Sequence, residues 1–305
     1  MRIFLTGGSG YIGSAVLDAL ARAGHQVSTV VRNGEKAATV EKRGGHPILA
    51  ELARPESYAA QAASAEAWIH AAADHSAQGP AIDKLTIDTL LAAAKNAGGG
   101  LFIYTSGVWV LGERAKPADE KTKVNPIEHV AWRAPHEKAV LKASAGTVRT
   151  AVVRPGVVYG GGGGIVGDML KDANRGIVRV IGTGENHWPL VYDRDLGDLY
   201  ARLIASPDSA GIYHANDEGD ERVNDVVEAI RAAAHVRPSL RHVPLAEARK
   251  KMGTYADALA LDQIVRSPRA RALGWTPSLR SVSGNVSRLF EEYRRATAAE
   301  STARR

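Results

Sequence analysis

A glycine-rich stretch near the start of the chain constrains the fold more than any other feature. Thr6-Gly7-Gly8-Ser9-Gly10-Tyr11-Ile12-Gly13 follows the short strand-like run Ile3–Thr6 and opens the helix-like stretch Tyr11–Ala23. Glycines at these spacings let the backbone turn tightly, approach a pyrophosphate and pack the helix against the strand. The helix N-terminus then presents N–H groups and the positive end of its dipole to the phosphates. The stretch therefore predicts a dinucleotide site, with contacts at Gly7, Gly10, Tyr11, Ile12 and Gly13.

Strand-like runs alternate with helical stretches over the first 155 residues. The expected strands are Ile3–Thr6, Gln26–Val31, His46–Leu49, Ala67–His70, Leu101–Thr105 and Thr150–Arg154. The expected helices are Tyr11–Ala23, Ala81–Ala97 and one that begins near Asn125-Pro126, where asparagine can cap and proline fits the first turn. This alternation, with several strands apolar throughout, predicts a doubly wound parallel Rossmann sheet of the α/β class.

The regular alternation ends after Arg154, where a five-glycine run, Gly160–Gly164, is interpreted as a loop. A strand is expected at Gly211–Ala215, and helices at Asp195–Ala205, at Asn224–Ala234 and near Ser281–Arg295. We expect a smaller C-terminal substrate lobe that is interwoven with the first domain. The Rossmann domain is expected at 1–158 plus about 188–213, the substrate lobe at about 159–187 and 214–297, and a tail at 298–305.

Composition excludes several classes of protein. Hydrophobic residues make up 45% and charged residues 24%, as in a globular protein with a large core, and the absence of cysteine excludes disulfides and thiolate metal sites. No apolar run reaches the length of about 18 residues that a membrane span needs, and the apolar start is too short for a signal peptide. We therefore expect a cytoplasmic protein without a membrane partner. The net charge of +6 is interpreted as a solvated surface and a basic tail rather than a nucleic-acid site.

The end of the second expected strand bears on the choice of cofactor. A site for NAD usually places Asp or Glu about 20 residues after the glycines, to bind the ribose 2′-hydroxyl. Here the strand ends in Val30-Val31-Arg32-Asn33, without an acid. A cation can neutralise a 2′-phosphate, so Arg32 favours NADP(H), with NAD(H) as the alternative. The other interpretation is that Arg32 only leaves the sheet for solvent.

The chain resembles the extended short-chain dehydrogenase/reductase family, which includes NAD-dependent epimerases and dehydratases of sugar nucleotides. The resemblance is carried by Thr6–Gly13, Trp68–Ala73, Tyr104–Gly107, Val153–Gly160 and Leu273–Pro277. It implies a Rossmann domain with a smaller substrate lobe, and a homodimer that packs through the helices near 81–97 and 126–144. Further cofactor contacts are expected at Glu51, Leu52, Ala71, Ala72 and Pro155.

The catalytic motif of that family, Tyr-x-x-x-Lys, is absent, because none of the nine tyrosines has lysine four residues later. The family frame, which continues with a glutamate and an Arg-Pro strand, places Arg133 at the lysine position and His129 at the tyrosine position. The spacing His129-x-x-x-Arg133-x-x-x-Glu137 predicts one helical face. At the family's serine position the sequence has Gly107, with Ser106 just before it.

The candidate catalytic residues are Ser106, His129 and Arg133. A neutral imidazole beside a cation has a lowered pKa, so His129 could accept a proton from an alcohol or donate a hydrogen bond to a carbonyl. Arg133 keeps its charge and its donors for the cofactor ribose. Ser106 could polarise the substrate oxygen. The alternatives are that His129 is a surface residue and that Ser106 only caps backbone groups. Candidate substrate contacts are Tyr159, Trp188 and Tyr192.

The function predicted from these residues is an NADP(H)-dependent oxidoreductase that acts on a carbonyl/alcohol pair of a small molecule. A nucleotide-sugar epimerase or dehydratase is one alternative, and a non-catalytic dinucleotide sensor, suggested by the missing tyrosine and lysine, is another. We expect no metal site. His136-Glu137 lacks the second histidine of a zinc motif at position 140, and Asp195 is interpreted as a helix N-cap.

Overall fold

The computed structural model describes residues 1–303 of the chain. Its strands are β1 (Arg2–Thr6), β2 (Gln26–Val31), β3 (His46–Leu49), β4 (Ala67–His70), β5 (Gly100–Thr105), β6 (Arg114–Ala118), β7 (Val148–Pro155), β8 (Val157–Tyr159), β9 (Ile177–Ile181), β10 (His187–Trp188), β11 (Leu190–Tyr192), β12 (Gly211–Ala215), β13 (Glu221–Arg222), β14 (Ser239–Val243) and β15 (Gln263–Val265).

The α-helices are α1 (Tyr11–Arg22), α2 (Gly34–Lys42), α3 (Ala59–Ala63), α4 (Gly79–Asn96), α5 (Arg133–Lys142), α6 (Gly164–Asn174), α7 (Asp193–Ala205), α8 (Val223–Ala233), α9 (Leu245–Met252), α10 (Tyr255–Leu259), α11 (Pro268–Ala272) and α12 (Val286–Ala303). Short 3₁₀ turns are η1 (Pro55–Ser57), η2 (Val108–Leu111), η3 (Glu128–Val130) and η4 (Ser283–Asn285).

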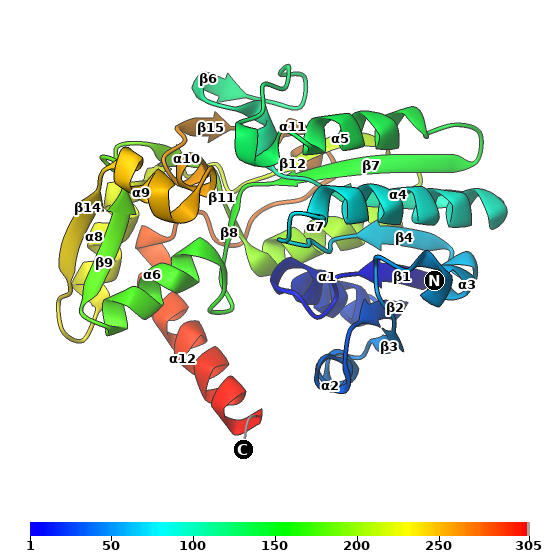
Figure 1. Cartoon of the computed structure of the whole chain (residues 1–305), viewed down its shortest axis with the longest axis horizontal. Helices are drawn as coiled ribbons and strands as arrows, with labels where there is room; N and C mark the ends of the chain where they lie inside the picture. Colours follow the sequence, from blue (N-terminus) through cyan, green and yellow to red (C-terminus); the bar gives the residue numbers. More distant parts are fainter. Residues whose placement is uncertain (304–305) are drawn as a thin grey trace.

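Seven parallel strands form the central sheet, in the order β12-β7-β5-β4-β1-β2-β3 (Figure 1). Most residues of the inner strands are buried hydrophobics on both faces; in β1 and β4, for example, Leu5 lies opposite Ile69 in the register. The order reverses at β1, so β2 and β4 lie on either side of it. In a sheet of this kind ligands bind at the carboxyl ends of the strands, beside that reversal.

Helices cover the sheet on both faces. One core cluster packs α1, α2 and α7 against one face, and a second packs α3, α4 and α5 against the other. A segment near the C-terminus also contributes to the first cluster. Trp275 is 1% exposed there, and its indole N–H donates to the Asp195 carbonyl oxygen at 2.7 Å. The doubly wound parallel sheet expected from the alternation is thus confirmed.

The C-terminal lobe has a core of its own, built from β8 to β11, α6, α8 and α12. Its strands are two to five residues long and pair beside the large sheet. β8 pairs with β11, β9 with β14 and β10 with β13. β15 returns to pair with β6 of the first half. The exact division into a Rossmann domain and a substrate lobe stays a prediction.

Three local expectations differ from the structure. The helix expected from Asn125-Pro126 begins at Arg133, because Pro135 lacks an N–H and fits only the first turn of a helix. Asp195 is not an N-cap, since α7 begins at Asp193, and its carboxylate accepts the N–H groups of Ser278 and Leu279. The predicted tail 298–305 continues α12 as far as Ala303, and residues 304–305 lie outside the described chain.

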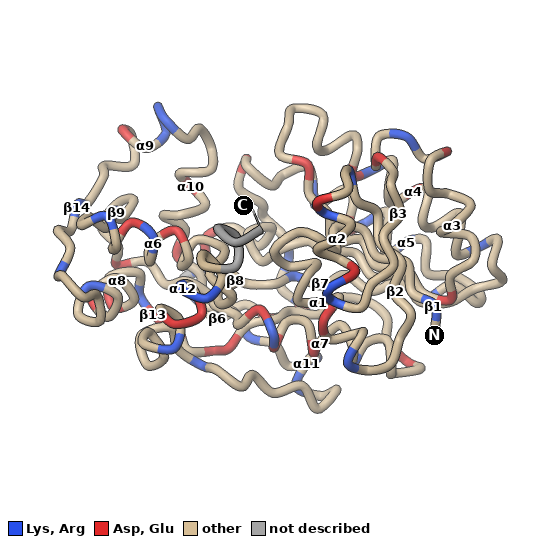
Figure 2. The backbone as a smooth tube through the Cα atoms, turned by 90° about the horizontal axis from the view of Figure 1, so that it is seen from below, with Lys and Arg blue, Asp and Glu red and all other residues tan. Residues whose placement is uncertain are grey.

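Charged residues are spread along both halves of the molecule, with basic and acidic positions interspersed (Figure 2). Of the helices in residues 1–303, none combines the length and the apolar character needed to cross a bilayer.

Candidate functional site

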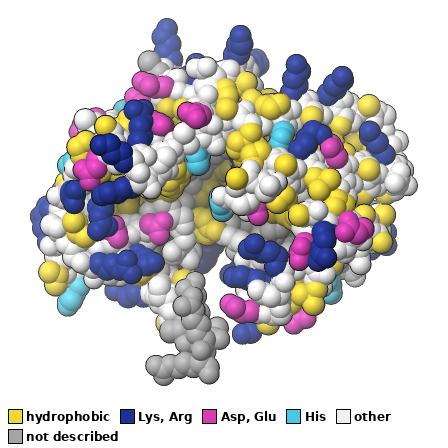
Figure 3. Space-filling model, in the orientation of Figure 1, with side chains coloured by type: hydrophobic (Ala, Val, Ile, Leu, Met, Phe, Trp, Pro, Cys, Tyr) yellow, Lys and Arg dark blue, Asp and Glu magenta, His cyan; other side chains and the backbone are white. Residues whose placement is uncertain are grey.

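A cavity of about 720 Å³ opens between the two halves, at the carboxyl ends of the strands. Figure 3 shows the hollow, with hydrophobic and histidine side chains at its rim. Its walls come from the glycine stretch, the loop after β4, the end of β5, the segment from η3 into α5, the β7–β8 connection and α10. The cavity therefore lies where the sheet order predicts a ligand.

The glycine stretch is shaped for close packing on one side and left open on the other. A Cβ at Gly7 would lie 2.7 Å from the Ala72 Cα, and one at Gly13 would lie 2.0 Å from the Gly7 carbonyl oxygen. A Cβ at Gly10 would meet only the Gly7 oxygen, at 3.2 Å. Since α1 begins there without a side-chain cap, its first N–H groups face this open cradle. These features fit a dinucleotide pyrophosphate.

The other expected cofactor residues fall into two groups. Tyr11, Ile12 and Pro155 line the cavity, and the Ala71–Ala72 backbone packs against Gly7. Arg32, Glu51 and Leu52 lie outside the cavity, past the ends of β2 and β3.

Arg32 is exposed and lies close to Asp74 of the loop after β4. Hydrogen bonds from Ser76, together with the charges of Arg32 and His75, lower the pKa of the Asp74 carboxyl. Glu51 is also exposed, and it forms an ion pair with Arg54 at 3.1 Å. Arg32 is thus the cation at the end of β2, as the sequence placed it.

Ser106 follows β5 directly and lines the cavity. It is only 7% exposed, yet its Oγ has no hydrogen-bond partner among the described residues. Its backbone N–H donates to the Val153 carbonyl oxygen, which fixes the residue at the sheet edge. A buried hydroxyl without a partner costs free energy unless a ligand completes its bonding. A ligand oxygen that reaches the Ser106 hydroxyl would supply the partner that it lacks.

His129 lies on the 3₁₀ turn η3, one turn before α5, so His129 and Arg133 do not share a continuous helix. Its Nδ1 is 3.2 Å from the Thr254 Oγ1 of the C-terminal lobe, which leaves Nε2 for a ligand. Burial, and then the charges of Arg133 and His75, lower the pKa of His129. The neutral imidazole is thus favoured near pH 7.

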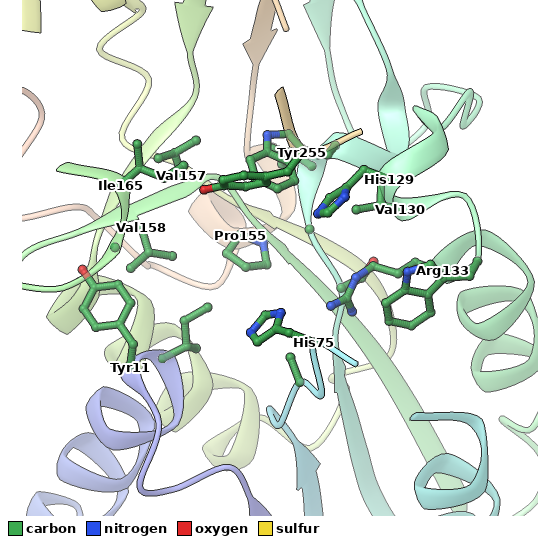
Figure 4. Close-up of a pocket in the computed structure, with 18 of the residues that line it drawn as sticks. Tyr11, His75, His129, Val130, Arg133, Pro155, Val157, Val158, Ile165 and Tyr255 are labelled. Carbon is green, nitrogen blue, oxygen red and sulfur yellow. The ribbon is translucent and has the colours of Figure 1, made fainter. Parts of the chain in front are cut away.

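Arg133, the first residue of α5, points its guanidinium into the cavity (Figure 4). One nitrogen donates to the Tyr104 hydroxyl at 3.2 Å and to the Thr105 carbonyl oxygen at 3.1 Å. The group also stacks on the Trp132 ring, 4.4 Å from its centroid. Glu137, expected on the same face, instead forms a buried bidentate ion pair with Arg154.

A buried polar network lies behind Arg133. Asp83 of α4 accepts hydrogen bonds from the Tyr104 hydroxyl at 2.9 Å and pairs with His136 Nδ1 at 2.7 Å. His70 Nε2 is 3.2 Å from the same carboxylate. Burial alone would raise the pKa of Asp83, but the bonds from His136 and His70 and the charge of Arg133 hold it well below its usual range. The network therefore keeps a carboxylate charged and holds the residue that faces the ligand.

Sequence reasoning missed several residues of the cavity. His75 comes from the loop after β4, and its ring faces the same space as His129 and Arg133 (Figure 4). Its place directly after the carboxyl end of a strand was a usable signal. Trp109 and Tyr255 make another wall, and Tyr255 comes from a helix of the C-terminal lobe that no motif marks.

The three expected substrate contacts are not in the cavity. Tyr159, Trp188 and Tyr192 are at most 3% exposed and belong to the core of the C-terminal lobe. The Tyr159 hydroxyl donates to Asp217, the Trp188 indole to the Leu259 carbonyl oxygen and the Tyr192 hydroxyl to Glu292. Because their polar atoms are engaged inside the lobe, the residues of the cavity wall replace them as candidate substrate contacts.

Comparison with known proteins finds a matching family, a related sequence and solved structures of the same fold. The sequence profile of the NAD dependent epimerase/dehydratase family matches residues 3–216. A 4-hydroxy-2-methyl-3-oxo-4-farnesyl-3,4-dihydroquinoline-1-oxide ketoreductase of Stigmatella aurantiaca is 33% identical over 171 residues, 52% of this chain and 51% of the relative.

Two solved structures share the fold over nearly the whole chain. The human epimerase family protein SDR39U1, solved with NADPH, has a TM-score of 0.80 at 22% identity and covers 95% of this chain and 99% of its own. The UDP-glucose 4-epimerase of Thermus thermophilus, solved with NAD, has a TM-score of 0.83 at 20% identity and covers 96% and 99%.

Proposed function

This chain belongs to the NAD-dependent epimerase/dehydratase family, and from that premise we propose that it is an NADP(H)-dependent oxidoreductase of a carbonyl/alcohol pair. The observation that carries the proposal is Ser106, a residue of the cavity wall whose buried Oγ has no hydrogen-bond partner among the described residues. The name of the Stigmatella relative, a ketoreductase, supports the same reaction class. A bound nicotinamide cofactor supplies the hydride chemistry.

The residues of this chain would then handle the substrate oxygen. The Ser106 hydroxyl donates a hydrogen bond to that oxygen and stabilises the negative charge that develops on it. His129 takes the proton of an alcohol at Nε2 in the oxidative direction and returns it in the reductive one, with Nδ1 held by Thr254. Arg133 stays charged, so it orients the ligand by hydrogen bonding and transfers no proton.

The preference for NADP(H) rests on Arg32. The Arg32 side chain is exposed at the end of β2, and the Asp74 carboxylate lies close to it. A guanidinium there can bind the 2′-phosphate of NADP(H) through two hydrogen bonds, whereas the 2′-hydroxyl of NAD(H) needs no such partner. The NADPH in the human SDR39U1 structure supports this choice, whereas the NAD in the Thermus thermophilus epimerase supports NAD(H), the alternative.

A calorimetric titration with NADPH, NADP, NADH and NAD tests the proposal, followed by a screen of carbonyl compounds for NADPH consumption. We expect the phosphorylated forms to bind at least about tenfold more tightly, a difference of about 1.4 kcal/mol. Gly10→Val should fold but lose dinucleotide binding, because its side chain fills the open cradle. His129→Ala should lower kcat and remove a titration from its pH profile. Tight NADPH binding without turnover of any carbonyl compound would instead establish a sensor.

A further inference from the structure

The part of the cavity that the dinucleotide cradle does not reach has two unlike walls. Figure 4 shows His129 and Arg133 on one side, Val157, Val158 and Ile165 on the other, and Tyr255 opposite His75. One wall thus offers hydrogen bonds and the facing wall offers only apolar surface. We propose that this space takes a flat, apolar and uncharged ketone, or the alcohol formed from it, rather than a nucleotide diphosphate. This inference rests on the proposed function.

The charges around the space argue against a diphosphate. Among the described residues that line the cavity, Arg133 is the only lysine or arginine. One of its nitrogens already donates to the Tyr104 hydroxyl and to the Thr105 carbonyl oxygen, and its face is stacked on Trp132. Asp168 of α6 lies near enough for its charge to add to burial in raising the pKa of Tyr255. On the substrate side a polyanion would therefore meet a single guanidinium, part of whose hydrogen bonding is already used, and the nearby negative charge of Asp168.

The aromatic residues suit a ring. Trp109, His129 and Tyr255 contact one another, with centroid distances of 6.2 Å between Trp109 and His129, 6.1 Å between Trp109 and Tyr255 and 5.4 Å between His129 and Tyr255. They come from η2, η3 and α10, so both halves of the molecule build this wall. Aromatic side chains held against one another form a rigid surface on which a flat ligand can stack.

Ser106 would then orient the ligand on the polar side. It lines the cavity and its buried Oγ lacks a partner among the described residues, whereas Val108, Val130 and Val157 add apolar lining. A ligand with an apolar body and a single carbonyl oxygen completes the bonding of Ser106 without burying further polar groups. A nucleotide would bury many polar groups against valines, which costs free energy.

The test measures direct binding by calorimetry, with and without saturating NADPH, for 2-tetralone, 9-fluorenone and UDP-glucose. We expect both ketones to bind at least about tenfold more tightly than UDP-glucose. Tyr255→Ala should weaken ketone binding by about tenfold, and Tyr255→Phe should retain it, because the stacking ring and not the hydroxyl makes the contact. The NADPH affinity of both variants should stay within about twofold of the parent.

The outcomes separate this inference from the proposed function. UDP-glucose binding more tightly than both ketones overturns the inference, and so does the failure of both ketones to bind protein that binds NADPH. Equal loss of ketone affinity in Tyr255→Phe and Tyr255→Ala also contradicts the stacked arrangement. A failure to bind any dinucleotide overturns the proposed function instead, and ketone binding to the free protein still decides the nature of the cavity.

Discussion

Two aspartates, one behind Arg133 and the other just after β12, are both buried and are held in opposite ways. Asp83 is 6% exposed and meets two imidazoles, a tyrosine hydroxyl and the charge of Arg133, so its pKa is lowered. Asp217, just after β12, is 2% exposed, and from the described residues its carboxylate accepts only the Gly219 N–H and the Tyr159 hydroxyl. Burial, with the nearby charges of Glu221 and Asp220, raises the pKa of Asp217 to about 7.

The difference shows that burial alone does not decide the charge of a carboxyl. Where imidazoles and a guanidinium are within reach, the carboxylate stays ionised and can hold a cation in place, as Asp83 does through Tyr104. Where only neutral donors are present, the protonated form gains and the group titrates near neutral pH, as for Asp217. The cofactor side of the molecule thus carries fixed charge, and the start of the C-terminal lobe carries a titrating one.

The largest effect is expected from Asp83→Asn, which keeps the shape and removes the charge. Two imidazoles and the Tyr104 hydroxyl then lose a charged acceptor and Arg133 loses a nearby negative charge, and we expect a loss of about 3 kcal/mol in the free energy of unfolding at pH 7. Since the folded pKa of Asp83 is lowered, its contribution is present above the unfolded value near 3.8 and is lost as the pH falls through the folded value. Urea denaturation between pH 3 and pH 8 measures this, and a constant difference across that range would contradict it.

A smaller effect of opposite sign is expected from Asp217→Asn. The folded pKa of about 7 lies above the unfolded value, so protonated Asp217 stabilises the fold at low pH and this stability is lost as the pH rises through 7. The variant should match the parent near pH 4 and be more stable at pH 8, by about 2 kcal/mol. Thermal unfolding at the two pH values tests the sign, and a variant less stable at pH 8 would refute the unpaired state of this carboxyl.

The smallest effect is expected from Tyr104→Phe, which removes only the hydroxyl between Asp83 and Arg133. One hydrogen bond to a charged group is lost, worth about 1 to 2 kcal/mol, and Arg133 keeps the Thr105 carbonyl as its acceptor. NADPH affinity measured by calorimetry should fall severalfold because the guanidinium is held less firmly. Tyr213→Phe, at the buried edge strand β12, is the matched control and should leave that affinity unchanged.

Much of the first half of the fold could be predicted from the sequence, because its signals are local. The strands at 26–31, 46–49 and 67–70 have the predicted bounds, since each is a short run of strand-forming residues between turns. Helix α5, before β7, begins later than predicted, because Pro135 fits only the first turn of a helix. In the C-terminal lobe the helix expected at Asn224–Ala234 lies within one residue of α8. The strands of this lobe were not predicted, since strands of two to five residues are specified by their partners and not by their own pattern.

The site divides along the same line. The glycine stretch and Ser106 sit at strand ends that the sequence reveals, and both lie at the cavity edge. Tyr255 reaches the cavity only because the chain folds back from the far lobe, which spacing along the sequence does not encode. Tyr159, Trp188 and Tyr192 show the reverse error, because aromatic residues after a strand serve a core as readily as a cleft.

The return of Trp275 to the core of the large sheet has a thermodynamic consequence. This indole, supplied by a segment between α10 and α12 of the C-terminal lobe, packs in the core cluster that contains α7 and bonds to the Asp195 carbonyl oxygen. Neither half can therefore lose its structure without exposing apolar surface of the other. The two lobes form one cooperative unit, so heat should melt them in a single transition and a fragment ending after β12 should lack a complete core.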